Sequence, residues 1–152
     1  MPKALKKSIK IFLFLLLTGA LMYRFFFYYD PDNQCLIRLK PSLTEWSNGN
    51  VKEGIKVLKY AVPDEYEKLC AYVDKINPNY SCGGLGGGCY ISGKAPTREI
   101  DISTAYDGFL GWTAAVIAHE TCHAVQHEEG RPFNETECYG IGNYVLYSAV
   151  VY

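Results

Sequence analysis

The segment 110–130, LGWTAAVIAHETCHAVQHEEG, carries the strongest structural signal in the chain. Its apolar residues, which include an unbroken run from Ala114 to Ala118, favour a helix that is buried along most of its length. Gly130 can end this helix in a left-handed turn, and Pro132 prevents it from continuing. We therefore expect one long helix from about residue 108 to residue 129.

This helix contains the pattern H-E-x-x-H at residues 119–123. The four-residue spacing places His119 and His123 one turn apart on the same face, where both rings can reach one zinc ion. Glu120 lies beside that face and can take a proton from a zinc-bound water. Buried histidines need partners, and a metal supplies them. The pattern predicts His119 and His123 as zinc ligands and Glu120 as the catalytic base.

A peptidase site needs a third protein ligand, and the donors that follow the motif are His127, Glu128, Glu129, Glu135 and Glu137. His127 lies about 12 Å from His119 along a regular helix, which is too far to share one ion, so we expect it on the surface. Asn134 has the form of a helix N-cap, and Glu137 can close a capping box with it. Glu135 is then free to face the zinc, which favours Glu135 over Glu137.

H-E-x-x-H followed by a helix-borne glutamate resembles the gluzincin zinc metallopeptidases, and the small size resembles their minimal members, the minigluzincins. The resemblance covers roughly residues 89–150. It implies that His119, His123 and Glu135 bind zinc and that Glu120 is the base. It also implies that the preceding strand, at 99–103, is a sheet edge on which a peptide substrate pairs.

Two positions depart from the gluzincin pattern. Only 11 residues separate His123 from Glu135, and Tyr139 stands where many gluzincins carry Asp or Asn to orient a zinc-binding histidine. Tyr139, Tyr144 and His127 are the candidates for stabilising a developing oxyanion.

The remainder of the body predicts further short elements. Asn50 opens a capping box before a helix at 51–60, and a second helix follows from residue 64 to about residue 76. Short strands are expected at 89–91 and 99–103, joined by a turn at 93–97, and a last helix at 134–150. Residues 30–50 show no regular pattern. The fold class is α+β and mainly helical, with a short antiparallel sheet and a zincin-like packing of the last two helices.

The N-terminal part of the chain differs in character from the rest. Residues 1–29 carry five basic residues and no acid, whereas residues 30–152 carry ten basic and all 16 acidic residues, so the overall charge of −1 is the sum of +5 and −6. Residues 11–29 are almost wholly apolar and close to the roughly 20 residues that cross a membrane as a helix. The lysines that precede them predict a cytoplasmic N-terminus and an extracytoplasmic body at 30–152. A cleaved signal peptide ending near residue 20 is the alternative to this anchor.

The six cysteines fit an exported domain, because thiols pair in an oxidising compartment. The spacing does not by itself select one pairing. We expect Cys82–Cys89 around a glycine-rich loop, Cys122–Cys138 between two helices and Cys35–Cys70 as the remaining pair.

Several classes of function are disfavoured. A nucleic-acid-binding protein would carry its basic residues on the folded body, and here the body is acidic. Residues 88–94 match the start of a phosphate-binding loop, but Ala95 and Pro96 replace the Ser or Thr and the helix that such a loop needs. The sequence predicts a zinc-dependent metallopeptidase with a peptide or protein substrate; a non-catalytic, disulfide-stabilised zinc module is the alternative.

Overall fold

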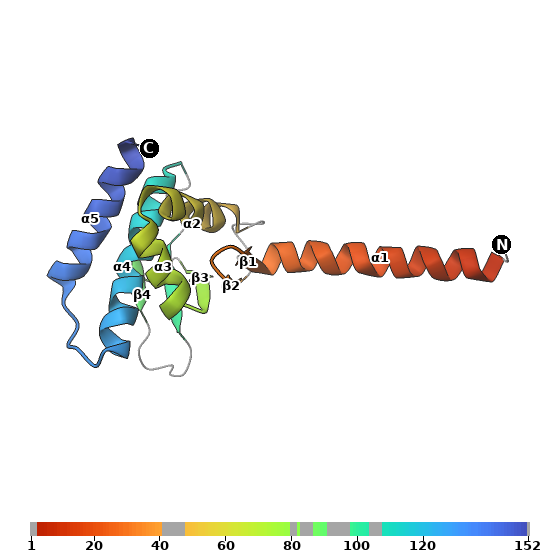
Figure 1. Ribbon diagram of the computed structural model, residues 1–152, viewed down its shortest axis with the longest axis horizontal. Helices are drawn as coiled ribbons and strands as arrows, with labels where there is room; N and C mark the ends of the chain where they lie inside the picture. The colour runs from red at the N-terminus through yellow and green to blue at the C-terminus, as the bar shows by residue number, and fades with distance from the viewer. Residues whose placement is uncertain are drawn as a thin grey trace.

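The computed structural model describes residues 3–40, 48–79, 82, 87–90, 98–103 and 108–151, and it is mainly helical (Figure 1). Its five helices are α1 (Lys3–Phe26), α2 (Gly49–Ala61), α3 (Pro63–Tyr72), α4 (Leu110–Glu128) and α5 (Glu135–Val151). Its strands are β1 (Phe27–Asp30), β2 (Cys35–Leu39), β3 (Lys75–Pro78), β4 (Gly88–Tyr90) and β5 (Glu99–Ile102).

The N-terminal apolar helix projects from one end of the body, and α5 lies at the opposite end (Figure 1). Within α1, the part from Leu5 to Phe26 is long and apolar enough to cross a membrane, and none of it is buried against the body. The helix ends at Phe26, because residues 27–30 form β1 and pair with β2. The aromatic run thus continues into the sheet rather than completing the helix through residue 29.

The five strands form one mixed sheet in the order β1-β2-β3-β5-β4. The antiparallel pairing of β4 with β5 matches the two strands predicted near 89–91 and 99–103, and Ile91 lies outside the described residues. The prediction of a purely antiparallel sheet is wrong, because β2, β3 and β5 run parallel in its centre. The predicted turn at 93–97 also lies outside the described residues.

Two local predictions are corrected by this sheet. Residues 30–50 are not wholly irregular, since β2 lies there with Cys35, Ile37 and Leu39 alternating inward. The second helix ends at Tyr72 rather than near residue 76, because β3 gains hydrogen-bonding partners on both sides. Asn50 is not the N-cap as predicted, because α2 begins at Gly49, two residues before the predicted start at residue 51, and its N-cap is Asn48.

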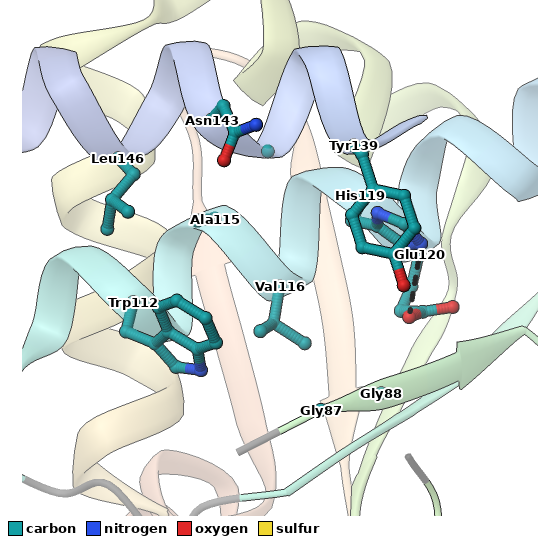
Figure 2. A pocket seen from close by; sticks show the side chains of 11 residues that line it. Gly87, Gly88, Trp112, Ala115, Val116, His119, Glu120, Tyr139, Asn143 and Leu146 are labelled. Atoms are coloured by element: carbon teal, nitrogen blue, oxygen red, sulfur yellow. Dashed lines mark ion pairs between the residues drawn. The ribbon is translucent and has the colours of Figure 1, made fainter. Parts of the chain in front are cut away.

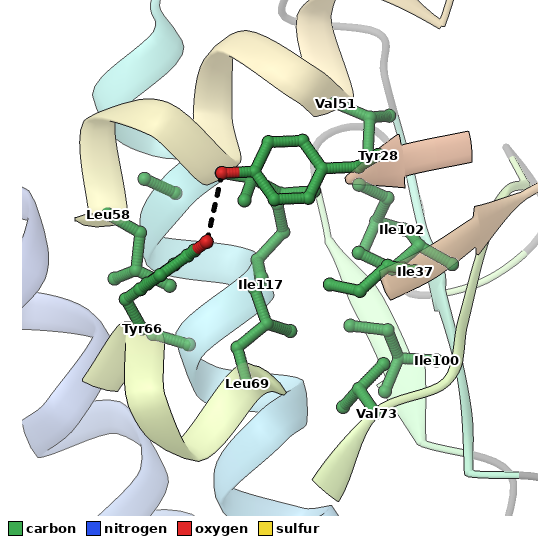
Figure 3. Close-up of a cluster of buried hydrophobic side chains, with 14 of the residues drawn as sticks. Tyr28, Ile37, Val51, Leu58, Tyr66, Leu69, Val73, Ile100, Ile102 and Ile117 are labelled. Atoms are coloured by element: carbon green, nitrogen blue, oxygen red, sulfur yellow. Dashed lines mark hydrogen bonds between the residues drawn. The ribbon is translucent and has the colours of Figure 1, made fainter. Parts of the chain in front are cut away.

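The core lies between one face of the sheet and the helices α2, α3 and α4 (Figure 3). Residues of the sheet, α2 and α3 become fully buried there, among them Ile37, Ile100, Leu58 and Leu69. The helix α5 packs along α4, and a Cβ atom on Gly142 would lie 3.3 Å from the carbonyl oxygen of Ala115. Helix α4 is therefore held between the sheet and α5.

All three predicted disulfides are present, namely Cys35–Cys70, Cys82–Cys89 and Cys122–Cys138. The first joins β2 to α3 and the third joins α4 to α5. The described residues contain no free cysteine.

A buried carboxylate ties β1 to α2 and α3. Burial by itself would raise the pKa of Asp30, but hydrogen bonds from Lys59, Tyr66 and Asn33 outweigh it and hold the pKa well below its usual range. The Nζ atom of Lys59 and the hydroxyl of Tyr66 both lie 2.6 Å from Asp30 Oδ2. The Tyr66 hydroxyl also accepts a hydrogen bond from Tyr28 at 3.0 Å (Figure 3).

The body is therefore expected to lose stability in acid through Asp30. A carboxyl whose pKa is depressed by folding stabilises the native state above its unfolded pKa of about 3.9, and this contribution is lost as the pH falls through the lower folded value. Asp30→Asn should lower the melting temperature at neutral pH by roughly 5 °C or more and flatten its acid dependence. The exposed Asp32→Asn is the control, and equal pH profiles for the two variants would contradict this role.

Candidate metal centre

Helix α4 carries the H-E-x-x-H residues into the interior. Its end is fixed as predicted at Gly130, which has φ +66°. The amide of Gly130 donates to the carbonyl of His127 at 3.0 Å, and the amide of Arg131 donates to that of Gln126 at 2.8 Å. This pair of bonds is the Schellman motif. Helix α4 thus continues beyond the H-E-x-x-H residues, and His119 and His123 lie on one face of it with their Nε2 atoms 3.2 Å apart.

Glu135, the first residue of α5, faces both histidines. Its Oε2 atom lies 3.3 Å from His119 Nε2, and its Oε1 atom lies 3.4 Å from His123 Nε2. Four ligands placed tetrahedrally at zinc–ligand distances of 2.0–2.1 Å are separated from one another by about 3.3–3.4 Å. The two histidine nitrogens therefore lie at about the spacing of two such ligands, and each of them faces a different oxygen of the Glu135 carboxylate at a similar distance.

Further contacts orient the two imidazole rings. His123 Nδ1 lies 3.2 Å from Gln126 Oε1, an atom that can only accept, so the ring carries its proton on Nδ1 and leaves the Nε2 lone pair free. The ring of His119 makes a hydrogen bond to the backbone of Cys138, which holds its orientation. Burial and the neighbouring His123 lower the pKa of His119, and Glu135 opposes this shift. The His119 ring therefore favours the neutral form that binds a metal.

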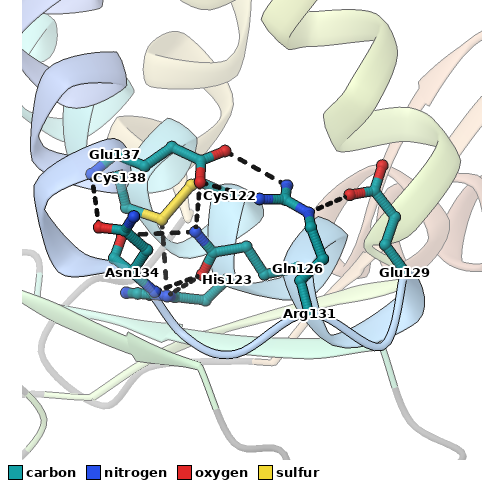
Figure 4. A network of polar contacts seen from close by, with 8 residues as sticks. All are labelled: Cys122, His123, Gln126, Glu129, Arg131, Asn134, Glu137 and Cys138. Atoms are coloured by element: carbon teal, nitrogen blue, oxygen red, sulfur yellow. Dashed lines mark hydrogen bonds and ion pairs between the residues drawn. A yellow bond between two sulfur atoms is a disulfide. The ribbon is translucent and has the colours of Figure 1, made fainter.

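Gln126 is a site residue that the sequence did not reveal as such. It is fully buried, and besides His123 it contacts the chain between α4 and α5 (Figure 4). Its Oε1 atom accepts from the Asn134 amide at 3.1 Å, and its Nε2 atom donates to Glu137 Oε2 at 3.1 Å. The only signal in the sequence is its place three residues after His123. Its amide links the orientation of a histidine to the start of α5.

Glu137, the alternative third ligand, is engaged elsewhere. Arg131 donates to both of its carboxylate oxygens, at 2.9 and 3.2 Å (Figure 4). Hydrogen bonds from Arg131 and Gln126 hold the pKa of Glu137 below its ordinary value. Asn134 caps α5 as predicted, by accepting from the Glu137 amide at 3.2 Å. The reciprocal bond of a capping box is not made, because the Asn134 amide donates to Gln126 instead.

The other donors after the motif point away from the histidines. Glu129 pairs with Arg131 at 2.6 Å, and Glu128 lies 3.7 Å from Arg98. His127 is exposed, as predicted, and its Nδ1 atom lies 2.6 Å from the hydroxyl of Tyr90. Of the five donors considered, only Glu135 faces both histidine Nε2 atoms.

Glu120 is buried beside this group, with Oε1 4.0 Å from His119 Nε2. Burial, and secondarily the charge of Glu135, raise the pKa of Glu120 to about 8. Strand β4 lies directly against it: a Cβ atom on Gly88 would come within 2.8 Å of Glu120 Cγ and Oε1. Only glycine allows the strand to approach this carboxyl so closely, and this requirement was not foreseen from the sequence.

A cleft of about 380 Å³ leads away from Glu120 (Figure 2). Trp112 of α4 and Leu146 of α5 line its far end, and His119 and Tyr139 line its near end. Val116 lies between Trp112 and Glu120, against Gly88. A second hollow of about 210 Å³ contains both histidines, Glu135, Phe133 and Tyr90. The two hollows share Gly88, His119, Glu120 and Tyr139, so they meet at the candidate base.

The strand at the edge beside this cleft is β4. The expectation that residues 99–103 form the edge is wrong, because β5 lies between β3 and β4 in the described sheet. Glu99 and Asp101 in β5 are buried, and Asn77 of β3 donates hydrogen bonds to both. Charged residues in this strand therefore reflect pairing inside the sheet and not an exposed edge.

Comparison of the chain with protein-family models, curated proteins and solved structures found no match. What this site does is therefore inferred from its own geometry. Among the candidates for oxyanion stabilisation, Tyr139 lines both hollows, with its ring centroid 4.6 Å from that of His119. Tyr144 instead lines a separate hollow with Ala61 and Val151.

Proposed function

We propose that the chain is a membrane-anchored zinc metallopeptidase. The observation that carries this proposal is the triangle formed by His119 Nε2, His123 Nε2 and one carboxylate of Glu135, with sides of 3.2–3.4 Å. The donors are two imidazoles and a carboxylate, a set that zinc accepts in catalytic sites. The Glu135 side chain is 64 % exposed, so this side of the centre is open to solvent.

A zinc ion held by these three residues would supply a Lewis acid that activates water and polarises a peptide carbonyl. The role of Glu120 is to accept the proton from the attacking water on its carboxylate and to deliver it to the departing amine. A positive ion nearby would also offset the burial that raises the pKa of Glu120, and so favour the ionised base.

We assign substrate binding to β4 and the cleft beside it. An extended peptide could add through backbone hydrogen bonds to the edge of β4 that has no strand partner in the described sheet, and Gly88 of this strand lies against Glu120. The apolar end of the cleft, with Trp112, Val116 and Leu146, suits a large apolar side chain next to the cleaved bond. We therefore expect cleavage beside apolar residues.

The membrane part of the proposal depends on α1 and on the disulfides. The helix is long enough to span a bilayer, and its N-terminal half carries Lys6, Lys7 and Lys10. Three disulfides favour an oxidising compartment for the body. These features support an anchor with a cytoplasmic N-terminus and an extracytoplasmic catalytic body.

Metal removal tests the proposed activity. The detergent-solubilised full chain is incubated with a mixture of defined peptides, and cleavage sites are found by mass spectrometry. Cleavage is expected beside apolar residues, should stop when phenanthroline removes the metal and should return when zinc is restored. Cleavage that resists chelation would contradict the mechanism. A zinc-loaded chain that cleaves nothing would favour the non-catalytic zinc module.

A further inference from the structure

A groove lies at the point where α1 enters the body. It has a volume of about 640 Å³, and its walls are Phe26, Phe27, Arg38, Lys40 and Lys75. Phe26 is the last residue of α1, and Phe27 is the first residue of β1. Arg38 lies in β2, Lys40 follows directly after β2, and Lys75 lies in β3. The groove is therefore next to the end of the helix that could span a membrane.

Basic residues dominate this groove although the body as a whole is acidic. Arg38 and Lys40 are exposed, and neither has an acidic partner within the part of the chain that the structure describes. Lys75 is paired with the buried Glu99 at 2.8 Å, so its charge is largely used inside the body. Arg38 and Lys40 thus bring to the groove two positive charges that no acidic residue of the described part of the chain compensates.

Apolar side chains surround these charges. On the outward face of the β1–β2 hairpin, Phe27 lies opposite Arg38 and Tyr29 lies opposite Leu36. Tyr29 is 55 % exposed and Leu36 is 50 % exposed. Aromatic residues next to the end of a membrane span are typical of the headgroup region of a bilayer. This face of the hairpin therefore combines the features of an interfacial surface with two free cations.

The body also holds the end of α1 in a defined position. The Nζ atom of Lys52 donates to the carbonyl of Arg24, and Asn48 Nδ2 donates to the carbonyl of Phe25 at 3.4 Å. These carbonyls belong to the last turn of α1, where the helix offers them no amide. The contacts fix the groove relative to the helix and keep it at the level where the span ends.

We propose that this groove binds the phosphate of an anionic phospholipid in the leaflet where α1 ends. Arg38 and Lys40 would contact the phosphate, and Phe26 and Phe27 would lie along the upper part of the acyl chains. The inference rests on the anchoring role proposed for α1 and is independent of the peptidase activity. Its consequence is that the body is oriented on the membrane by lipid as well as by its helix.

Lipid retention by the full chain tests this site. The protein is reconstituted in nanodiscs of phosphatidylcholine with or without phosphatidylglycerol and extracted into mild detergent, and the retained lipid is identified by native mass spectrometry. The unmodified chain should retain phosphatidylglycerol in preference. A basic residue near an anionic surface contributes about five-fold to binding, so R38Q/K40Q should reduce this preference by roughly thirty-fold.

The matched control is K56Q/K68Q, which removes two charges from α2 and α3. A loss in this control equal to that in R38Q/K40Q, or no lipid preference in the unmodified chain, would overturn the proposal. Displacement of the lipid by inorganic phosphate, but not by chloride of equal ionic strength, would show a free-anion site and also overturn it. Flotation with vesicles tests the membrane anchor separately from the lipid site. A chain that does not float contradicts the anchor itself.

Discussion

Replacing Glu120 with glutamine is expected to abolish peptide hydrolysis while leaving about one zinc ion per chain. Glutamine keeps the size of the side chain under β4 but cannot accept the proton, and loss of a general base typically lowers the rate by about 10²–10⁴-fold. Zinc should remain because Glu120 lies 4.0 Å from His119 Nε2, outside the triangle of 3.2–3.4 Å that His119, His123 and Glu135 form. The measurements are turnover of a cleaved peptide and zinc content by mass spectrometry.

The control for this variant is Glu128→Gln, the same substitution in the same helix at an exposed position. It should retain the activity of the unmodified chain. Full activity in Glu120→Gln would rule out Glu120 as the base. A loss of zinc in Glu120→Gln would instead make this residue a ligand and contradict the arrangement proposed for the centre.

Replacing Glu135 with glutamine is expected to release zinc, whereas the same change at Glu137 should not. Changes to groups that merely support a metal ligand weaken metal binding by about 10–100-fold, so loss of a ligand should cost more than about 100-fold. Glu137 contacts Arg131 and Gln126 instead of the histidines. Glu137→Gln should therefore keep zinc but lower the melting temperature by a few degrees.

A competition titration with a zinc chelator measures both affinities, and thermal unfolding of the metal-free chains measures both stabilities. The two variants form a matched pair, because they lie two residues apart in the first turn of α5. Tight zinc binding by Glu135→Gln together with weak zinc binding by Glu137→Gln would contradict Glu135 as the third ligand and favour Glu137.

The parts of the fold that the sequence predicted are those set by local pattern. Helix α4 follows from its apolar run and from Gly130, whose left-handed conformation ends it. The N-cap of α5 follows from Asn134. Cys82–Cys89 was expected around a loop and Cys122–Cys138 between two helices, which left Cys35–Cys70 as the remaining pair, and all three disulfides form.

The parts of the fold that could not be predicted from the sequence depend on pairing between segments that are far apart in the chain. Strand β3 has only four residues and ends in Asn77 and Pro78, so its sequence resembles the end of a helix; its partners, β2 and β5, decide its conformation. The gluzincin resemblance likewise implied an edge at 99–103, whereas the acidic residues of β5 are bound by the amide of Asn77, which lies more than 20 residues away.

The candidate site divides in the same way. The spacing of His119 and His123 on one helix is local, and the structure brings their Nε2 atoms together. The positions of Gln126 and Gly88 become meaningful only when α5 and β4 pack against α4, and no local pattern marks them. Residues that orient a metal ligand, or that allow a strand to approach closely, can therefore be identified only from the tertiary structure.

The most direct test of the proposed centre is anomalous diffraction at the zinc edge from crystals of the zinc-loaded chain. We expect one peak about 2.0–2.2 Å from the Nε2 atoms of His119 and His123 and from a carboxylate oxygen of Glu135, with no fourth protein ligand. A peak at another place, or a fourth donor from the chain that closes the coordination, would contradict a catalytic zinc site.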